Sequence, residues 1–162
     1  MHHFSVLFVC MGNLCRSPTA HAVFLQRVAQ AGLADRVRIA SAGTHASTRP
    51  EPPDARAQAV ALRQGYALEP LRSRRVVDSD FLAFDLLLAM DQDNLAHLRR
   101  RCLATELHRV RCLTEFCVHS DALFVPDPYY GNVQGFERVL ALIEDACDGL
   151  LLHVRRQLNA QA

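Results

Sequence analysis

The feature that most constrains this chain is an apolar run near the N-terminus that leads directly into a short loop and a helix start. Residues 5–9 are rich in β-branched and aromatic side chains, which predicts a buried strand. Ser17 is expected to be the N-cap of the following helix, with Pro18 at its first position and Gly32 near its end. A strand that turns this tightly into a helix directs backbone N–H groups and the positive helix end at one point, which favours anion binding.

Cys10 and Arg16 begin and end this loop, at a Cys-x5-Arg spacing. A thiol placed there faces aligned N–H dipoles, a helix N-terminus and a guanidinium, so we expect the pKa of Cys10 to lie below its ordinary value of about 8.5. Arg16 offers a planar fork that matches two phosphate oxygens. A lone cysteine at a strand end is often merely buried. The loop context instead favours a nucleophile at the centre of an oxyanion cradle.

The fuller pattern of residues 10–18, Cys-x-Gly-Asn-x-Cys-Arg-Ser-Pro, resembles the phosphate-binding loop of the low-molecular-weight protein tyrosine phosphatases. The resemblance extends from Val6 to the last predicted helix and includes residues 52–57 and 84–91. It implies a metal-independent and cofactor-independent hydrolase that acts on phosphotyrosine and other aryl phosphate monoesters through a phosphocysteine intermediate. The thioredoxin-linked arsenate reductases share this loop and fold.

Within the loop, the resemblance assigns Cys10 as the nucleophile, and Arg16 with the backbone N–H groups as the ligands of the phosphate. The loop residues expected to line the substrate are Met11, Gly12, Asn13, Leu14, Cys15 and Ser17. The family gives the serine matching Ser17 a role in stabilising the thiolate, which is compatible with capping. Gly12 gives the backbone freedom to approach the phosphate, and Asn13 is expected to fix the loop through its amide.

Asp127-Pro128-Tyr129-Tyr130 is the second motif that the resemblance singles out. Asp-Pro alone is a common turn, but the four residues match the family's acid loop in composition and in their place before the last helix. A phenol leaves far better when protonated, so Asp127 is expected to act as general acid and then as base for water. Tyr129 and Tyr130 are expected to line the rim of the site. Simple coverage of a surface turn is the alternative for both rings.

Three further residues are candidates for supporting the loop, and two of them have an alternative role. Ser41 matches a serine that supports the family's loop. Cys15 matches a cysteine that can trap oxidised Cys10 as a disulfide, and plain packing explains Cys15 equally well. Asp91 could pair with Arg16, but capping of the next helix is the favoured interpretation.

Two positions depart from the family pattern. Ser47 stands where many members carry Trp or Tyr as a wall of the phosphotyrosine slot, so the wall should be smaller or built differently. Leu71 stands near the place where some members have a histidine that supports the loop asparagine.

Periodicity along the rest of the chain predicts alternating strands and helices. Strands are expected at 5–9, 37–41, 84–90 and 107–113, and helices at 55–64, 78–82, 91–100 and 136–158. Alternation of this kind is typical of an α/β fold in which crossovers are right-handed and strands parallel. We therefore expect residues 1–162 to form a single domain with a four-stranded parallel sheet and helices on both faces.

Composition narrows the cellular context. The net charge of +1 indicates neither nucleic-acid binding nor membrane attachment, and no apolar run is long enough to span a bilayer. The N-terminus does not resemble a signal peptide, so a cytoplasmic location is expected. The six cysteines should be mostly reduced, and their spacing does not suggest zinc. The resemblance implies phosphotyrosine proteins as partners, with a bacterial tyrosine kinase as one candidate, and we expect a monomer or weak dimer.

Two other functions compete with a phosphatase. An arsenate reductase would need two more cysteines on a mobile segment, and the available pairs, Cys112/Cys117 and Cys102/Cys112, are not at that family's usual place. A phosphopeptide-binding module would be expected to lack the nucleophile or the acid, and this chain has both. Nicotinamide or flavin binding is disfavoured because no GxGxxG follows the first strand.

Overall fold

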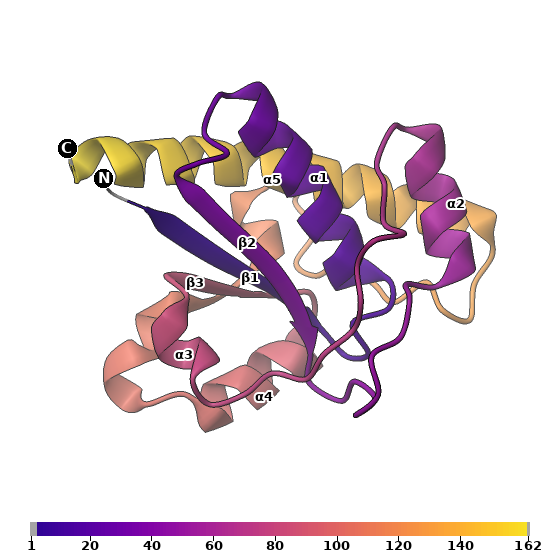
Figure 1. Cartoon of the computed structure of the whole chain (residues 1–162). Helices are drawn as coiled ribbons and strands as arrows, with labels where there is room; N and C mark the ends of the chain where they lie inside the picture. The colour runs from indigo at the N-terminus through magenta and orange to yellow at the C-terminus, as the bar shows by residue number, and fades with distance from the viewer. Residues whose placement is uncertain (1–2, 162) are drawn as a thin grey trace.

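A four-stranded parallel sheet forms the centre of the computed structural model, which describes residues 3–161 (Figure 1). Its spatial order is β2-β1-β3-β4, and all neighbouring pairs are parallel. The strands are β1 (Phe4–Cys10), β2 (Val37–Gly43), β3 (Leu86–Ala89) and β4 (Val110–Cys112). Because parallel strands end at the same edge, the segments that follow β1, β2 and β3 meet there.

Helices cover both faces of this sheet. Figure 1 shows α1, α2 and α5 on one side, and α3 and α4 on the other. Their bounds are α1 (Arg16–Gln30), α2 (Ala55–Arg63), α3 (Asp80–Ala83), α4 (Gln92–Arg101) and α5 (Val133–Ala160), with 3-10 turns η1 (Ala104–Arg109) and η2 (Leu113–Phe116). The predicted fold class is confirmed. Among the described residues, no helix is long and apolar enough to cross a membrane.

The central strand β1 supplies side chains to two separate hydrophobic cores. Val6 and Phe8 pack with α1 and α5, whereas Leu7 and Val9 face the core beneath α3 and α4. A strand between two neighbours must bury both faces, which explains why its sequence is a continuous apolar run rather than an alternating one.

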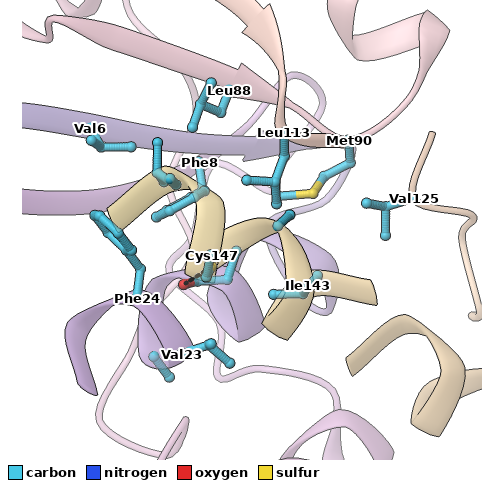
Figure 2. Close-up of a cluster of buried hydrophobic side chains, with 14 of the residues drawn as sticks. Val6, Phe8, Val23, Phe24, Leu88, Met90, Leu113, Val125, Ile143 and Cys147 are labelled. Atoms are coloured by element: carbon cyan, nitrogen blue, oxygen red, sulfur yellow. Dashed lines mark hydrogen bonds between the residues drawn. The ribbon is translucent and has the colours of Figure 1, made fainter. Parts of the chain in front are cut away.

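The larger core lies between the sheet and helices α1 and α5. In Figure 2, Phe8 and Leu88 from the sheet point toward Phe24 of α1 and Ile143 of α5. Cys147 is fully buried there, and its desolvation raises the pKa of the thiol. Cys147 is therefore a packing residue of this core.

Two strands are shorter than the sequence predicts. Residues 107–109 belong to the 3-10 turn η1, and β4 begins only after it. Arg109, the last residue of this turn, pairs with Glu106 and donates to the carbonyl of Phe84, and these two contacts stabilise the turn. Phe84 is the C-cap of α3, and the carboxylate of Asp85 accepts a hydrogen bond from the N–H of Ser5. The backbone N–H of Asp85 also donates to the carbonyl of Ser5 at 3.0 Å, so contact with β1 begins at Asp85 although β3 itself begins at Leu86.

A close contact between α5 and η2 predicts a severe effect of substitution at Gly149. A Cβ atom there would lie 1.7 Å from the carbonyl oxygen of Phe116 in η2, which is backbone and cannot rotate away. We expect Gly149→Ala to lower the free energy of unfolding by at least about 3 kcal/mol, measured by urea denaturation.

Gly135, in the first turn of the same helix, is the matched control. A Cβ atom there would meet only atoms 3.8 Å away. Gly135→Ala should therefore cause no loss and could add up to about 1 kcal/mol through helix propensity. Equal effects of the two substitutions would contradict the close packing of α5 on η2.

Candidate active site

The loop between β1 and α1 is held from outside through its carbonyl groups. The carbonyl oxygens of Cys10, Met11 and Leu14 each accept a hydrogen bond from a neighbouring segment. The donors are the N–H groups of Thr44 at 2.9 Å, His45 at 2.8 Å and Asp54 at 2.7 Å. In a planar trans peptide the N–H points opposite to the carbonyl. The N–H groups that follow these carbonyls are therefore turned inward, toward the space above Cys10.

Asn13 fixes the middle of the loop, as the sequence predicts. It has a left-handed backbone, with φ of 56°, which Asn tolerates better than most residues. Its Nδ2 donates to the hydroxyls of Ser17 at 2.8 Å and Ser41 at 3.1 Å, and its Oδ1 accepts from the N–H of Arg74. Ser41 thus supports the loop as expected. The N–H of Arg74 satisfies the amide from a segment that also contains Leu71.

The expected role of Ser17 as a helix cap is wrong. Helix α1 begins one residue earlier, at Arg16, with Cys15 at the N-cap and no side-chain capping bond. The hydroxyl of Ser17 instead lies 3.0 Å from Cys10 Sγ. This hydroxyl accepts from Asn13, and its own proton can go to the carbonyl of Ala42 at 3.4 Å or to the sulfur at 3.0 Å. Donation to the sulfur, the shorter contact, is the arrangement that stabilises a thiolate. Pro18 is accordingly the third helical residue and not the first.

Arg16 is a buried cation surrounded by acceptors. Its Nη1 donates to Asp91 Oδ2 at 2.6 Å and to the carbonyl of Val125 at 3.1 Å, and its Nη2 lies 3.6 Å from Asp127 Oδ2. Burial opposes the charge, but Cys10 and the two carboxylates outweigh it and raise the pKa of Arg16. Asp91 also caps α4 by accepting from the N–H of Asn94, so its pairing and capping roles coexist.

These groups open into one cavity of about 310 Å³ at the carboxyl edge of the sheet. Its lining residues are Cys10, Met11, Gly12, Leu14, Cys15, Arg16, Asp127, Tyr129 and Tyr130. Cys10 lies deep, with 3% of its surface exposed, whereas the two tyrosines stand at the rim. The structure therefore brings the thiol, the guanidinium and the distant carboxyl of Asp127 together, as the sequence predicts.

Comparison with known proteins gives the family. Residues 5–161 match the family model described as "Low molecular weight phosphotyrosine protein phosphatase". The chain belongs to this family. It is 42% identical to the low molecular weight protein-tyrosine-phosphatase of Streptomyces coelicolor over 98% of both chains, and 36% identical to the human low molecular weight phosphotyrosine protein phosphatase over 91% of this chain and 93% of the human one. The crystal structure of a protein tyrosine phosphatase from Entamoeba histolytica is similar, with a TM-score of 0.89, 38% identity and coverage of 95% and 98%.

In this low-molecular-weight phosphatase fold, one wall of the cavity is fixed by an arginine that sequence reasoning missed. The guanidinium of Arg56 lies over the ring of Tyr129, 5.2 Å from its centroid, and over Phe136 at 4.8 Å. It is held at 2.9 Å by Asp54, the N-cap of α2. Tyr130 packs edge-on against Tyr129 and is almost fully exposed.

The departure at Ser47 has a structural counterpart. Ser47 is exposed and is not among the residues that line this cavity. The loop after β2 contributes Thr44 and His45 to an adjoining cavity instead. The slot is therefore built differently from one walled by an aromatic side chain at this position.

The remaining cysteines resemble packing residues rather than a redox relay. Burial raises the pKa of Cys102 and Cys112, and raises that of Cys117 to about 11. The three thiols are absent from the set of residues lining the cavity. Burial, followed by the charge of Cys10, also raises the pKa of Cys15, which leaves it a neutral thiol beside the nucleophile. Within residues 3–161, no cluster of three or more His, Cys, Asp or Glu side chains is arranged to hold a metal ion.

Sequence reasoning also missed Gly43, at the end of β2. A Cβ atom there would lie 2.6 Å from the carbonyl oxygen of Met11 and 2.9 Å from the backbone nitrogen of Asn13. Glycine is thus required for β2 to approach the loop. A glycine at the end of a strand can indicate a close backbone approach, but the sequence alone does not tell which segment lies against Gly43.

The contact between Ser17 and Cys10 predicts a measurable change in thiol acidity. Ser17→Ala removes a hydroxyl donor from the sulfur, so the thiolate loses stabilisation and alkylation of Cys10 by iodoacetate at neutral pH should slow about tenfold, the equivalent of one lost hydrogen bond. The rate of alkylation measured as a function of pH gives this profile. Ser47→Ala, at an exposed serine, should leave the profile unchanged. Identical profiles for wild type and Ser17→Ala would contradict the proposed proton direction.

Proposed function

We propose that the protein hydrolyses phosphotyrosine in phosphoproteins, with Cys10 as the nucleophile, Arg16 and the loop N–H groups as phosphate ligands, and Asp127 as general acid and base. The observation that carries this proposal is a single cavity with a thiol at its base and a carboxyl at its mouth. The two are joined through Arg16, whose Nη2 lies 3.6 Å from Asp127 Oδ2.

The charge distribution suits a phosphoryl dianion. The inward N–H groups of the loop and the N-terminus of α1 offer dipoles, and Arg16 offers a full charge that Asp91 holds in place. Since these donors are fixed before substrate binds, they would stabilise the equatorial oxygens of the transition state without reorganisation.

Two steps follow from this geometry. In the first, Cys10 Sγ attacks phosphorus, an S–P bond forms, the P–O bond to the aryl group breaks, and protonated Asp127 gives its proton to the leaving oxygen. In the second, water attacks phosphorus while the Asp127 carboxylate accepts its proton, and the S–P bond breaks to regenerate the thiolate. The N–H of Tyr129 donates to Asp127 Oδ1 at 3.1 Å, which orients the carboxyl.

The depth of the thiol favours an aryl ester. Cys10 is almost fully buried, so a phosphate must reach the base of the cavity on a long side chain, and a tyrosine ring could then pack against Tyr129 and Tyr130 at the rim. A tyrosine kinase is the class of enzyme that would supply such a substrate. A cytoplasmic location fits six free cysteines. The oligomeric state that we propose is a monomer or weak dimer.

Replacing the nucleophile should separate binding from chemistry. Cys10→Ser is expected to abolish hydrolysis of p-nitrophenyl phosphate, because a serine hydroxyl is not ionised at neutral pH, while inorganic phosphate still binds to the loop and Arg16. Steady-state kinetics and isothermal titration calorimetry measure the two properties. Cys117→Ser is the matched control and should retain turnover. Full activity of Cys10→Ser would rule out the phosphocysteine mechanism.

Replacing the acid should depend on the leaving group. Asp127→Ala is expected to reduce kcat/KM for phenyl phosphate about 100-fold, in the range of a general-acid contribution, and to affect p-nitrophenyl phosphate much less because nitrophenolate leaves without a proton. Asp121→Ala, at an exposed carboxylate outside the cavity, is the control. An equal loss on both substrates would argue against proton donation by Asp127.

A further inference from the structure

A second cavity, of about 490 Å³, adjoins the catalytic cavity and is larger than it. The two share Met11, Arg16 and Asp127, so they border one another at residues that surround the proposed phosphate position. The proposed chemistry uses only the first cavity. The second therefore offers space for a part of the substrate that lies beside the phosphotyrosine.

Helix α4 and the loop after β2 form the two walls of this second cavity. Asp93, Ala96, His97 and Arg100 line it from α4, at the spacing of one helix face. Thr44 and His45 line it from the loop. The ring of His45 packs edge-on against the ring of His97, with 5.2 Å between the ring centroids. This contact joins the loop after β2 to helix α4, which is labelled in Figure 1.

Arg100 is the cation in this cavity that is available to a ligand. Arg16 is already held by Asp91 and Asp127. Burial, followed by the charges of His45, Arg101 and Arg100, lowers the pKa of His97, so this ring is neutral at pH 7.

Arg100 is exposed, and its guanidinium forms no hydrogen bond or ion pair within residues 3–161. The carboxylate of Asp93 lies on the same face, about 10 Å from Arg100 along the helix axis at 1.5 Å per residue. It is in the first turn of α4, where the helix dipole favours a negative charge. The two charges are therefore separated along the cavity, with the positive one at the end far from Arg16.

We propose that the second cavity binds the polypeptide on one side of the phosphotyrosine and that Arg100 selects an acidic side chain there. The proposal rests on the proposed phosphatase function. Arg100 is nine positions after Asp91, which contacts Arg16, and this corresponds to roughly 13 Å along the helix. An extended peptide covers this distance in about four residues. The preferred acidic residue therefore lies about three or four positions from the phosphotyrosine.

Charge reversal at Arg100, with Arg99 as matched control, tests this assignment. Arg99 is exposed on the same helix but is not among the residues that line the cavity. The substrates are phosphotyrosine peptides with a single Glu or Lys at each of four positions on either side, and every rate is normalised to turnover of p-nitrophenyl phosphate. Wild type should prefer Glu over Lys by about fivefold at one of the outer positions, as expected for one exposed ion pair.

Arg100→Glu should abolish or invert this preference, and Arg99→Glu should leave it intact. Equal effects of the two variants, or a wild type with no preference at any position, would overturn the proposal. Peptide affinities for the Cys10→Ser variant provide a readout that needs no turnover. A Glu preference in binding together with no hydrolysis by wild type would refute the phosphatase function and still support the subsite. Hydrolysis with no Glu preference would support the phosphatase function and refute the subsite.

Discussion

The site depends on the orientation of the peptide units in the loop after β1. Three carbonyls face outward because N–H groups of Thr44, His45 and Asp54 bind them, and the following N–H groups must then face inward. The donors come from the two segments that flank the loop, one after β2 and one before α2. An anion cradle of this kind is thus not a property of the loop alone, since its polarity is imposed by the surrounding backbone.

The second constraint is the buried charge of Arg16. A guanidinium that is 2% exposed must be compensated, and Asp91 and the carbonyl of Val125 compensate one of its nitrogens. The other nitrogen faces the cavity and Asp127. The guanidinium is therefore anchored on one side and available on the other, so that in the proposed function it would bind phosphate oxygens with little loss of side-chain entropy.

Much of the fold and the centre of the site could be predicted because their signals are local. The apolar run of β1, the Cys-x5-Arg spacing and the Asp127 motif each lie within a few residues, and a parallel sheet brings strand ends together. The contacts that could not be predicted join residues distant in sequence or involve backbone atoms. Backbone atoms are the same in every residue, so the sequence does not indicate which of them will form such a contact. The N–H of Arg74, the carbonyl of Val125 and the ring contact of Arg56 are of this kind. The expectation that Ser17 caps α1 is wrong because the helix begins one residue earlier, and its hydroxyl contacts Cys10 Sγ instead.

The beginning of α2 links two parts of the site that belong to different segments. The N–H of Asp54 binds the carbonyl of Leu14 in the loop, while its carboxylate holds Arg56, which lies over Tyr129. The phosphate-binding loop and the Tyr129 ring are therefore both positioned by Asp54. A displacement of Asp54 would act on both contacts at once, so we expect the depth of the slot, from the Cys10 sulfur to the Tyr129 ring, to change little if α2 shifts.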